Sequence, residues 1–516
     1  MRLRTTLGSP ASRCLAVVLA ASLLVTACSS GSKDSSTSGK DGGTLVVGYT
    51  ADPNTLDPWK ATQFQAVRLL EQIYGTLTQL DADLGVVPGL AEKWQYADDN
   101  KTLTFTLRQG VKFQDGKPFS SADVKSSLDR LRDKATAAVA ASTLATVQSV
   151  DAPDPNTVVL HLSGPDAGLL AGLATVNLAM LSKDDTSQTV AQKPNGTGAF
   201  TFASRTANQS ITLKSNADYW GGKPKLAGLE FRIIPDETSM VSALQSGNVQ
   251  FAVLNDPLVA KSAEGGGITV TKTPDLSYHV LQLNARNKPL DNLNVRLAIQ
   301  CAIDRQQVLD TAALGAGAVV GPITSPAYKS DPDARPCPKR DVAKAKSLLS
   351  DAGLSNGVTI KTIVSTGEYA TSVNEAQNLQ AQLKEAGITL QLETLESGAY
   401  VDRWVAGTFD AAVALNGGRP DPDGMYGRYF TSTGNLNKVA GYSSPKLDEL
   451  FAQGKATTDP AQRKAIYAQV SNQLEDNAVW VWLFSSYIFT ATTQGVQGFK
   501  PMANGSLQFL RQTSVN

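Results

Sequence analysis

The chain has 516 residues, of which 42% are hydrophobic, and its 47 basic residues balance 47 acidic residues. This length exceeds one ordinary hydrophobic core, so two or three domains are expected. The neutral charge argues against nucleic acid as a partner, because recognition of phosphates needs a clear basic excess.

The first 27 residues have the pattern of a signal peptide. Three arginines and no acidic residue accompany a mostly apolar run from Cys14 to Val25, which is too short to span a bilayer. The run ends in VTAC, and small residues before Cys28 resemble the lipobox of bacterial lipoproteins. The resemblance implies cleavage before Cys28 and a diacylglyceryl group on that cysteine. The alternative is an ordinary signal peptide with a cysteine near its cleavage site.

Residues 28–42 are predicted to be a flexible tether. The stretch SSGSKDSSTSGKDGG has no large apolar residue, so it cannot bury enough surface to offset the entropy of ordering. A tether behind a lipid anchor would hold a soluble body at the outer face of the cytoplasmic membrane, in the cell envelope or periplasmic space.

The rest of the chain has the pattern of a mixed α/β protein. Strands are predicted in GGTLVVGYT, LTFTLR and ITLQLETL, and an Asp-Gly turn in FQDGKPF. Helices are predicted in SSADVKSSLDRL, with Ser120 or Ser121 as N-cap, and in NEAQNLQAQLKEAG, which ends at Gly387. LLAGLATVNLAML is short and carries Asn177, so it is expected in the core. GAGAVVG, residues 315–321, is expected to be a loop.

Two cysteines remain beyond the signal peptide and anchor. In an exported protein, Cys301 and Cys337 permit one disulfide bond. The alternative is two separate buried thiols.

Catalytic and metal-binding patterns are poor. The two histidines, His161 and His279, lie far apart, and no G-x-S-x-G, H-E-x-x-H, C-x-x-C or P-loop occurs. Without a Cys/His cluster, direct coordination of a metal such as Ni²⁺ is not expected. The sequence therefore predicts neither an enzyme nor a cofactor, although a metal carried by a small chelator stays open as a ligand.

Several segments in order resemble one family. They include LAEKWQYADDNKTLTFTLRQGVKFQDGKPFSSADVKSSLDRL, NADYWGGKPKLAGLEFRII, LQLNARNKPLDNLNVRLAIQCAIDR and DVAKAKSLLSDAG. The set is similar to the family 5 extracellular solute-binding proteins, the peptide- and nickel-binding group of ABC import systems. The resemblance implies a two-lobed clamp of the periplasmic-binding-protein kind. Lobe one would comprise residues 43–275, with an added subdomain at about 80–190 and a return of the chain at 478–516, and lobe two residues 276–477.

The resemblance also predicts where the ligand binds. TFDAAVALNGGRPDPDG matches a loop that faces the interlobe cleft in the family, and di- and oligopeptide binders place an aspartate there that receives the ligand's ammonium group. In this sequence the matching place falls on Gly418 or Arg419, and a cation at Arg419 would suit a carboxylate, a phosphate or sugar hydroxyls. Asp421 is either a substitute for that aspartate or an ordinary turn residue.

The complete set of predicted ligand-binding residues is Thr62, Phe64, Tyr278, Tyr400, Trp404, Asn416, Gly418, Arg419 and Asp421. The alternatives are that Thr62 is a helix N-cap, that the aromatic residues belong to the core, and that Arg419 points to solvent.

The leading hypothesis is a monomeric, lipid-anchored substrate-binding protein that captures a peptide or another small polar solute and delivers it to the permease and ATPase of an ABC importer. A ligand-sensing surface lipoprotein is one alternative. A binder of a sugar, an anionic metabolite or a metal chelate is another. A surface hydrolase is disfavoured, because no nucleophile–base pattern occurs.

Overall fold

The computed structural model of the protein describes residues 42–367 and 369–516. The predicted signal peptide, Cys28 and nearly all of the predicted tether lie outside the described residues. The described chain is a mixed α/β protein, which confirms the predicted fold class.

The largest element is a mixed sheet of twelve strands that runs through the described chain. Ten strands follow one path, and two more, β12 (Ile268–Pro274) and β14 (Gly317–Val319), pair with β18. The path is β16 (Ile388–Leu395), β15 (Val358–Ser365), β17 (Ala411–Asn416), β13 (Tyr278–Leu283), β18 (Trp480–Thr493), β11 (Phe251–Leu254), β1 (Thr44–Tyr49), β10 (Gly228–Ile233), β9 (Ser210–Ser215) and β8 (Phe200–Thr206).

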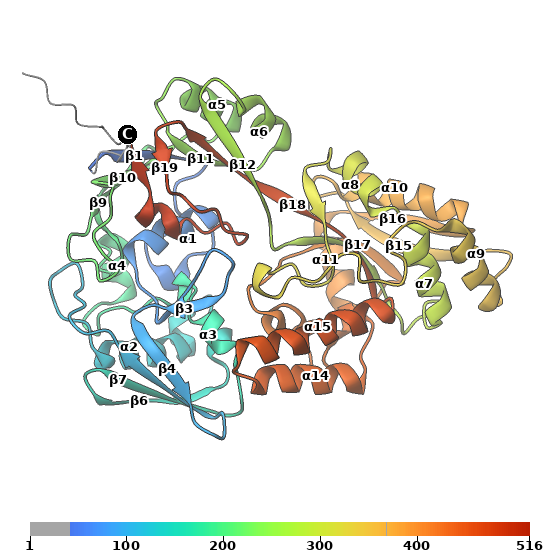
Figure 1. The fold of residues 1–516 in the computed structure, drawn as a ribbon, viewed down its shortest axis with the longest axis horizontal. Coiled ribbons are helices and arrows are strands. Elements are labelled where there is room, and N and C mark those ends of the chain that lie inside the picture. Colours follow the sequence, from blue (N-terminus) through green and yellow to red (C-terminus); the bar gives the residue numbers. More distant parts are fainter. Residues whose placement is uncertain (1–41, 368) are drawn as a thin grey trace, which may run out of the picture. The chain divides into compact units, whose positions relative to one another are not determined.

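Strand β18 belongs to both halves of this sheet (Figure 1). Its first half, residues 480–486, pairs with β13 and β14, and its second half, residues 487–493, pairs with β11 and β12. A single long strand therefore joins two groups of strands that otherwise have separate cores.

These cores define two lobes. We use "first lobe" for the part packed around the cluster that contains Leu45, Phe105 and Phe231. "Second lobe" denotes the part packed around the two clusters that contain Val413 and Trp480. The lobe boundaries at residues 275 and 477 and the subdomain at about 80–190 stay predictions.

The first lobe also holds a four-stranded antiparallel sheet, β4 (Ala91–Tyr96), β5 (Thr102–Leu107), β7 (Thr157–Leu162) and β6 (Val147–Asp154), in that order. Two small strand pairs are β2 (Thr78–Leu80) with β3 (Val86–Pro88), and β19 (Val496–Gln497) with β20 (Ser514–Val515). The α-helices that precede β12 in the chain are α1 (Phe64–Ile73), α2 (Ser121–Arg132), α3 (Leu169–Gly172), α4 (Ser187–Gln192), α5 (Glu237–Gln245) and α6 (Pro257–Ala263).

The second lobe carries the remaining α-helices. They are α7 (Leu293–Ala302), α8 (Arg305–Ala312), α9 (Val342–Asp351), α10 (Ser372–Glu385), α11 (Ser397–Ala406), α12 (Arg428–Phe430), α13 (Asn437–Ala440), α14 (Pro445–Ala456) and α15 (Pro460–Asp476). A turn of π-helix, Asp423–Gly427, directly precedes α12. Within the described residues, no helix combines the length and the apolar character that a membrane crossing requires.

Local sequence signals explain several of these elements. Helix α2 begins at a capping box in which Ser120 and Asp123 satisfy each other's backbone N–H groups, so Ser120 is the N-cap. Gly387 has φ +86° between α10 and β16, a conformation that glycine adopts without steric cost. The loop predicted at residues 315–321 is partly wrong, because Gly317–Val319 forms β14. A side chain at Gly317 would meet the Ser485 carbonyl at 2.4 Å, so glycine lets this strand approach β18.

Candidate functional site

A cleft of about 720 Å³ lies between residues of the two lobes. Its first-lobe wall comes from the start of α1, from residues 139–143 and 166–177, and from the tail at residues 504–511. The second-lobe wall is the loop at residues 417–424, and residues 275–277 lie where the chain passes between the lobes. This volume is in the range of sites for small ligands.

The loop that follows β17 forms the second-lobe wall because the backbone comes very close to a neighbouring segment. A Cβ on Gly418 would lie 1.9 Å from the Leu276 carbonyl oxygen, so only glycine fits there. The Thr324 hydroxyl donates to the same Leu276 oxygen at 2.5 Å, and the Ser325 hydroxyl donates to the Pro420 oxygen at 2.7 Å. Gly418 therefore shapes the cleft through its backbone.

Arg419 lines the cleft with an exposed side chain. Within residues 42–367 and 369–516 its guanidinium has no hydrogen bond or ion pair. Partial burial and the positive charge of Arg428 lower the pKa of Arg419, and Tyr429 opposes this shift. The cation at this position is therefore available to a ligand.

Asp421 also lines the cleft, but its carboxylate is already engaged. Arg463 Nη2 donates to Oδ1 at 3.0 Å, and Arg463 Nη1 donates to Oδ2. Burial disfavours the charged form of Arg463, yet the Asp421 carboxylate outweighs this effect and raises the pKa of Arg463. The N–H of Asp423 donates to Asp421 Oδ1 at 3.0 Å, so Asp421 also caps the turn. This geometry favours the turn-residue alternative over a substitute for the missing aspartate.

Two further carboxyl groups meet beside Asp421, one from each lobe. Burial and the charges of Asp421 and Asp166 raise the pKa of Asp423 to about 6, against the cation of Lys455, whose Nζ lies 3.7 Å away. Burial also raises the pKa of Asp166, although the Thr146 hydroxyl donates to its Oδ2 at 2.8 Å. A proton is therefore held more tightly here than on an exposed aspartate.

Thr62 and Phe64 lie at the rim of the first-lobe wall. The Thr62 hydroxyl accepts a hydrogen bond from Asn54 Nδ2 at 3.3 Å, and Gln63, not Thr62, occupies the N-cap of α1. Phe64 is 70% exposed, so it is not a core aromatic. Both side chains are accessible to a ligand.

The remaining predicted contacts lie away from the cleft. Tyr278, Tyr400 and Asn416 are buried in the second lobe, and Trp404 is partly buried there. Their polar atoms have internal partners: Tyr400 donates to the Val413 oxygen at 2.8 Å, Trp404 Nε1 to Gln282 Oε1 at 2.7 Å, and Asn416 Nδ2 to the Tyr278 hydroxyl at 3.4 Å. In this structure these four side chains stabilise the lobe and do not line the cleft.

Sequence reasoning missed part of the first-lobe wall. Glu71 on α1 accepts hydrogen bonds from the Ser506 hydroxyl at 2.8 Å and the Leu507 N–H at 3.1 Å, and burial raises the pKa of Glu71. Arg511 lines the cleft nearby. No local signal connects Glu71 with residues about 435 positions later.

A buried polar chain lies beside the cleft, between β13, β18 and α10. His279 Nδ1 lies 2.8 Å from Glu375 Oε1, and its Nε2 lies 3.1 Å from Ser486 Oγ. The three side chains follow the order of a Ser–His–carboxylate triad, although His279 Nδ1 makes no hydrogen bond of good geometry with a described residue. However, none of the three residues lines the cleft, and the His279 ring is stacked on Phe484 with centroids 4.1 Å apart. The arrangement therefore offers a substrate no approach from the cleft, and we assign it to packing of the second lobe.

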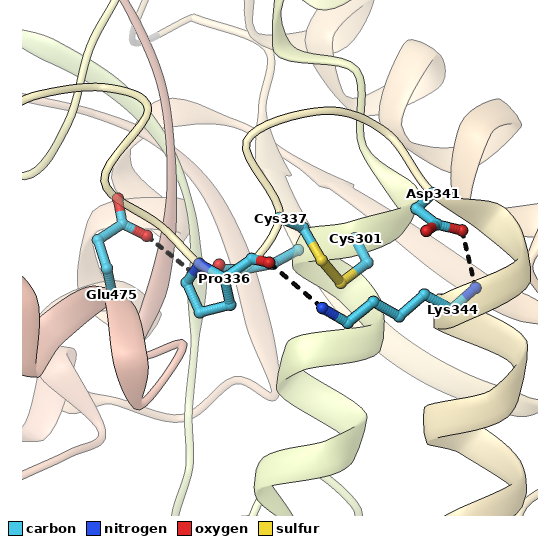
Figure 2. Close-up of a disulfide and its surroundings, with 7 residues drawn as sticks. Cys301, Pro336, Cys337, Asp341, Lys344 and Glu475 are labelled. Carbon is cyan, nitrogen blue, oxygen red and sulfur yellow. Dashed lines mark hydrogen bonds between the residues drawn. A yellow bond between two sulfur atoms is a disulfide. The ribbon is translucent and has the colours of Figure 1, made fainter.

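Cys301 on α7 and Cys337, which precedes α9, form a disulfide bond with their Cα atoms 5.0 Å apart (Figure 2). The Asp341 N–H donates to the Cys301 oxygen at 2.7 Å, and Lys344 Nζ donates to the Pro336 oxygen at 3.3 Å. The disulfide thus anchors one end of the segment whose other end contacts Leu276 through Thr324 and the cleft loop through Ser325.

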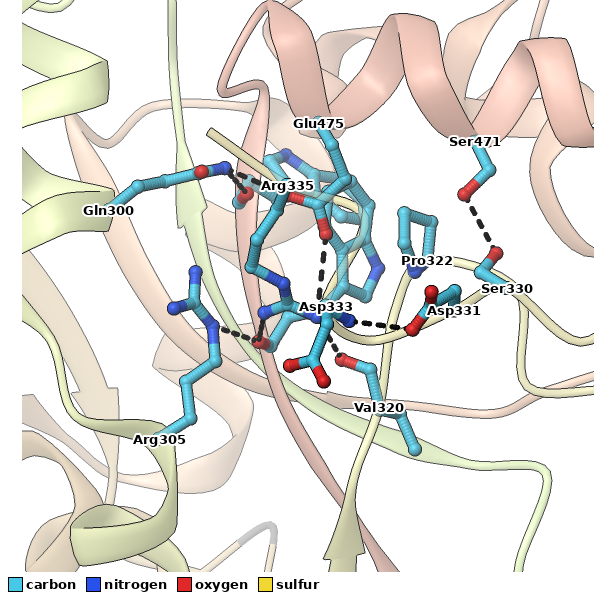
Figure 3. A network of polar contacts seen from close by, with 12 residues as sticks. Gln300, Arg305, Val320, Pro322, Ser330, Asp331, Asp333, Arg335, Ser471 and Glu475 are labelled. Carbon is cyan, nitrogen blue, oxygen red and sulfur yellow. Dashed lines mark hydrogen bonds and ion pairs between the residues drawn. The ribbon is translucent and has the colours of Figure 1, made fainter. Parts of the chain in front are cut away.

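A buried ionic network holds the same segment next to the disulfide, at Arg335 (Figure 3). Arg335 Nη2 donates to the Val320 oxygen at 2.8 Å and lies 3.6 Å from Glu475 Oε1, and Gln300 Nε2 donates to Glu475 Oε2 at 3.1 Å. Burial raises the pKa of Glu475, against the charges of Arg335 and Arg305. These contacts hold in place the segment that contains Ser325, whose hydroxyl donates to the Pro420 oxygen of the cleft loop.

No three His, Cys, Asp or Glu side chains among the described residues gather so that they could hold a metal ion. The residues in the cleft offer charged groups, hydroxyls and backbone to a solute instead.

The two lobes and the cleft between them define the class of two-domain solute-binding proteins, and the comparisons with known proteins identify the family. The family model described as "Bacterial extracellular solute-binding proteins, family 5 Middle" matches residues 85–437. The chain therefore belongs to family 5, which confirms the family inferred from the sequence. It is a solute-binding protein of the ABC importer type.

Similar proteins extend this result over nearly the whole chain. The glutathione-binding protein GsiB of Escherichia coli (strain K12) is 27% identical over 517 residues, which covers 95% of this chain and 96% of GsiB. HbpA2 from Haemophilus parasuis is 26% identical with a TM-score of 0.84 and covers 92% of this chain and 100% of its own. DppA from Helicobacter pylori, in complex with the peptide STSA, is 27% identical with a TM-score of 0.69. The match covers 92% of this chain and 98% of the DppA chain.

Proposed function

We propose that this protein captures a small peptide, or a peptide-like solute, in the cleft between its lobes and delivers it to the permease of an ABC importer. The observation that carries the proposal is a cleft of about 720 Å³ lined by both lobes, with the exposed Phe64 on one side and, on the other, Arg419, which has no ion pair with any described residue. Binding between two lobes buries most of a small ligand, and hinge closure would sequester it.

The names of two relatives support the peptide class. GsiB is named a glutathione-binding protein, and the DppA structure contains a tetrapeptide. Glutathione and STSA are therefore the first probes.

We also propose that the protein acts as a monomer, without bond-making chemistry, and that a lipid on Cys28 holds it at the outer face of the cytoplasmic membrane. The lipobox-like VTAC sequence supports the anchor. Two acyl chains suit stable anchoring, since each buried methylene contributes about 0.8 kcal/mol.

The test of ligand class is isothermal titration of the purified full-length protein with glutathione and with STSA. Micromolar or tighter binding of one of them is expected. Phe64→Ala should weaken that binding roughly tenfold, because an apolar contact of the order of 1.5 kcal/mol is lost. Leu258→Ala is the matched control: Leu258 on α6 is 62% exposed and does not line the cleft. Failure of both peptides to bind, or equal loss in both variants, would contradict the proposal.

The anchor is tested separately by Cys28→Ala. We expect this variant to lose incorporation of a radiolabelled fatty acid and to leave the membrane fraction. Unchanged labelling and retention would exclude Cys28 as the lipidated residue.

A further inference from the structure

A cluster of hydrogen-bond donors begins at the second-lobe wall of the cleft, which Arg419 lines, and continues behind that wall with two residues that do not line the cleft. It consists of the guanidinium groups of Arg419 and Arg428 and the phenol of Tyr429, and we call it the donor cluster. The guanidinium carbon of Arg428 lies 4.8 Å from the centre of the Tyr429 ring. The Arg419 side chain packs over Gly424, where a Cβ would lie 3.4 Å from Arg419 Cδ. Gly424 lies in the π-helical turn Asp423–Gly427, and Arg428 follows this turn directly as the first residue of α12.

The electrostatics agree with this geometry. The charge of Arg428 is one of the causes that lower the pKa of Arg419. Burial raises the pKa of Tyr429, and both arginines oppose that rise. Three donor side chains therefore lie within electrostatic reach of one another.

The donor cluster has no acceptor of its own in the part of the chain that the structure describes. Arg428 Nε is buried and has no hydrogen-bond partner. Neither Arg419 nor Arg428 forms an ion pair or a side-chain hydrogen bond with a described residue. Two like charges held near each other without a counter-charge destabilise the folded protein, and a bound anion would relieve that repulsion.

The acidic residues that line the cleft are engaged elsewhere. Asp421 is held by Arg463, and Glu71 accepts from Ser506 and Leu507. Asp275 accepts from the Leu276 N–H at 2.7 Å within its own turn. Asp423 faces Lys455, and Asp166 accepts from Thr146. The charge left unpaired at the second-lobe wall is therefore positive.

We propose that the ligand presents an oxyanion, a carboxylate or a phosphate, to Arg419, and that Arg428 acts as a positioning residue that strengthens the positive field behind it. The planar guanidinium matches the two oxygens of such a group. This inference rests on the proposed function as a solute binder. If the proposal holds, the second-lobe wall carries a positive charge for a ligand oxyanion. A site built around an aspartate would instead carry a negative charge for a ligand ammonium group.

The test compares one peptide with and without its C-terminal charge and adds two simple oxyanions. The full-length protein is titrated with Ala-Ala-Ala bearing a free carboxylate, with the same peptide as its C-terminal amide, and with citrate and inorganic phosphate at constant ionic strength. The variants are Arg419→Met, Arg428→Met and the control Arg403→Met. Arg403 lies on α11, pairs with Glu393 at 2.6 Å and does not line the cleft.

We expect the wild-type protein to prefer the free acid to the amide at least about tenfold, as for the loss of one hydrogen bond to a charged group. Arg419→Met should abolish this preference and the binding of citrate or phosphate. Arg428→Met should reduce the preference several-fold, and Arg403→Met should leave it unchanged. A purely structural role for Arg419 would weaken acid and amide alike and preserve their ratio.

The outcomes separate the two proposals. Equal binding of acid and amide by the wild-type protein would retain the peptide function and overturn the oxyanion site. Binding of citrate or phosphate that depends on Arg419, with no binding of either peptide, would retain the oxyanion site and overturn the peptide function. Failure of every oxyanion probe to bind, or their unchanged binding by Arg419→Met, overturns the oxyanion site.

Discussion

Asp421 and Arg463 form a buried ion pair with two hydrogen bonds at the base of the cleft, with side chains only 10% and 5% exposed. Arg463 also donates to the Gly454 oxygen at 2.9 Å and to the Tyr328 hydroxyl at 2.8 Å. The pair therefore ties the cleft loop to α14 and α15.

The first prediction concerns this pair. Asp421→Asn should lower the free energy of unfolding by about 3–5 kcal/mol, because Arg463 would remain buried without its counter-charge. Urea denaturation measures the loss. Glu393→Gln, which breaks the exposed pair with Arg403, should cost less than about 1 kcal/mol. Unchanged stability together with lost ligand binding would instead place Asp421 in direct contact with the ligand.

The second prediction concerns pH and Asp423. Its pKa is about 6 in the folded protein and near 3.8 in the unfolded chain, so the folded state binds the proton more tightly. The contribution of Asp423 to the free energy of unfolding is therefore greatest below about pH 4. It falls as the pH rises towards 6, by at most about 3 kcal/mol.

Asp423→Asn should remove this pH dependence. The variant should be more stable than the wild-type protein at pH 7, by less than that limit because the contact with Lys455 is also lost, and its unfolding free energy should change less between pH 4 and 6. Asp402→Asn, at an exposed position of α11, is the control and should leave the profile unchanged. An identical profile for Asp423→Asn would show that Asp423 does not cause the dependence.

The sequence predicted the position of the cleft loop better than its chemistry. The resemblance of TFDAAVALNGGRPDPDG to a cleft-facing loop of the family located Gly418, Arg419 and Asp421 at the cleft. The partner of Asp421 was not predictable, since Arg463 lies on a distant helix and carries no local signal. Burial of that pair favours a structural role for Asp421, which the first prediction tests.

The aromatic residues show where the sequence did not predict the site, because residues expected at the cleft are packed inside the second lobe. Tyr278 lies on β13, which is buried on both faces between β17 and β18, so alternation along the strand does not distinguish core from cleft. Tyr400 and Trp404 are four residues apart on one face of α11 and pack inward. Glu71 and Ser506 meet only because the tail returns to α1. Long-range contacts of this kind need the three-dimensional structure.

The third prediction uses two adjacent glycines. Gly418→Ala should destabilise the protein by about 1–3 kcal/mol and weaken ligand binding, because its Cβ would lie 1.9 Å from the Leu276 oxygen and displace the loop. Gly417→Ala is the matched control, since a Cβ there meets nothing within 4 Å. Thermal unfolding measures the loss of stability, and titration with a peptide that binds the wild-type protein measures the loss of affinity. Equal behaviour of the two variants would mean that the loop moves freely and is not braced by Leu276.

The fourth prediction concerns the disulfide between Cys301 and Cys337, which are separated by 36 positions. Replacing both cysteines by serine should lower the unfolding free energy by about 3–4 kcal/mol, because closure of a chain of this length restricts the unfolded state. The reductant dithiothreitol should destabilise the wild-type protein and leave the double variant unaffected. Peptide mapping without reductant should find the two cysteines linked, and free thiols at both positions would contradict the bond.

The same double variant tests whether the disulfide supports the cleft. The bond anchors the segment that carries Arg335 and, nearer the cleft, Thr324 and Ser325, whose hydroxyls hold the Leu276 and Pro420 oxygens. If this segment acts as one support, the double variant should bind the ligand more weakly even under conditions where it is fully folded. If affinity is unchanged while stability falls, then the buried contacts of Arg335 with Val320 and Glu475 hold the segment without the disulfide, and the bond serves stability alone.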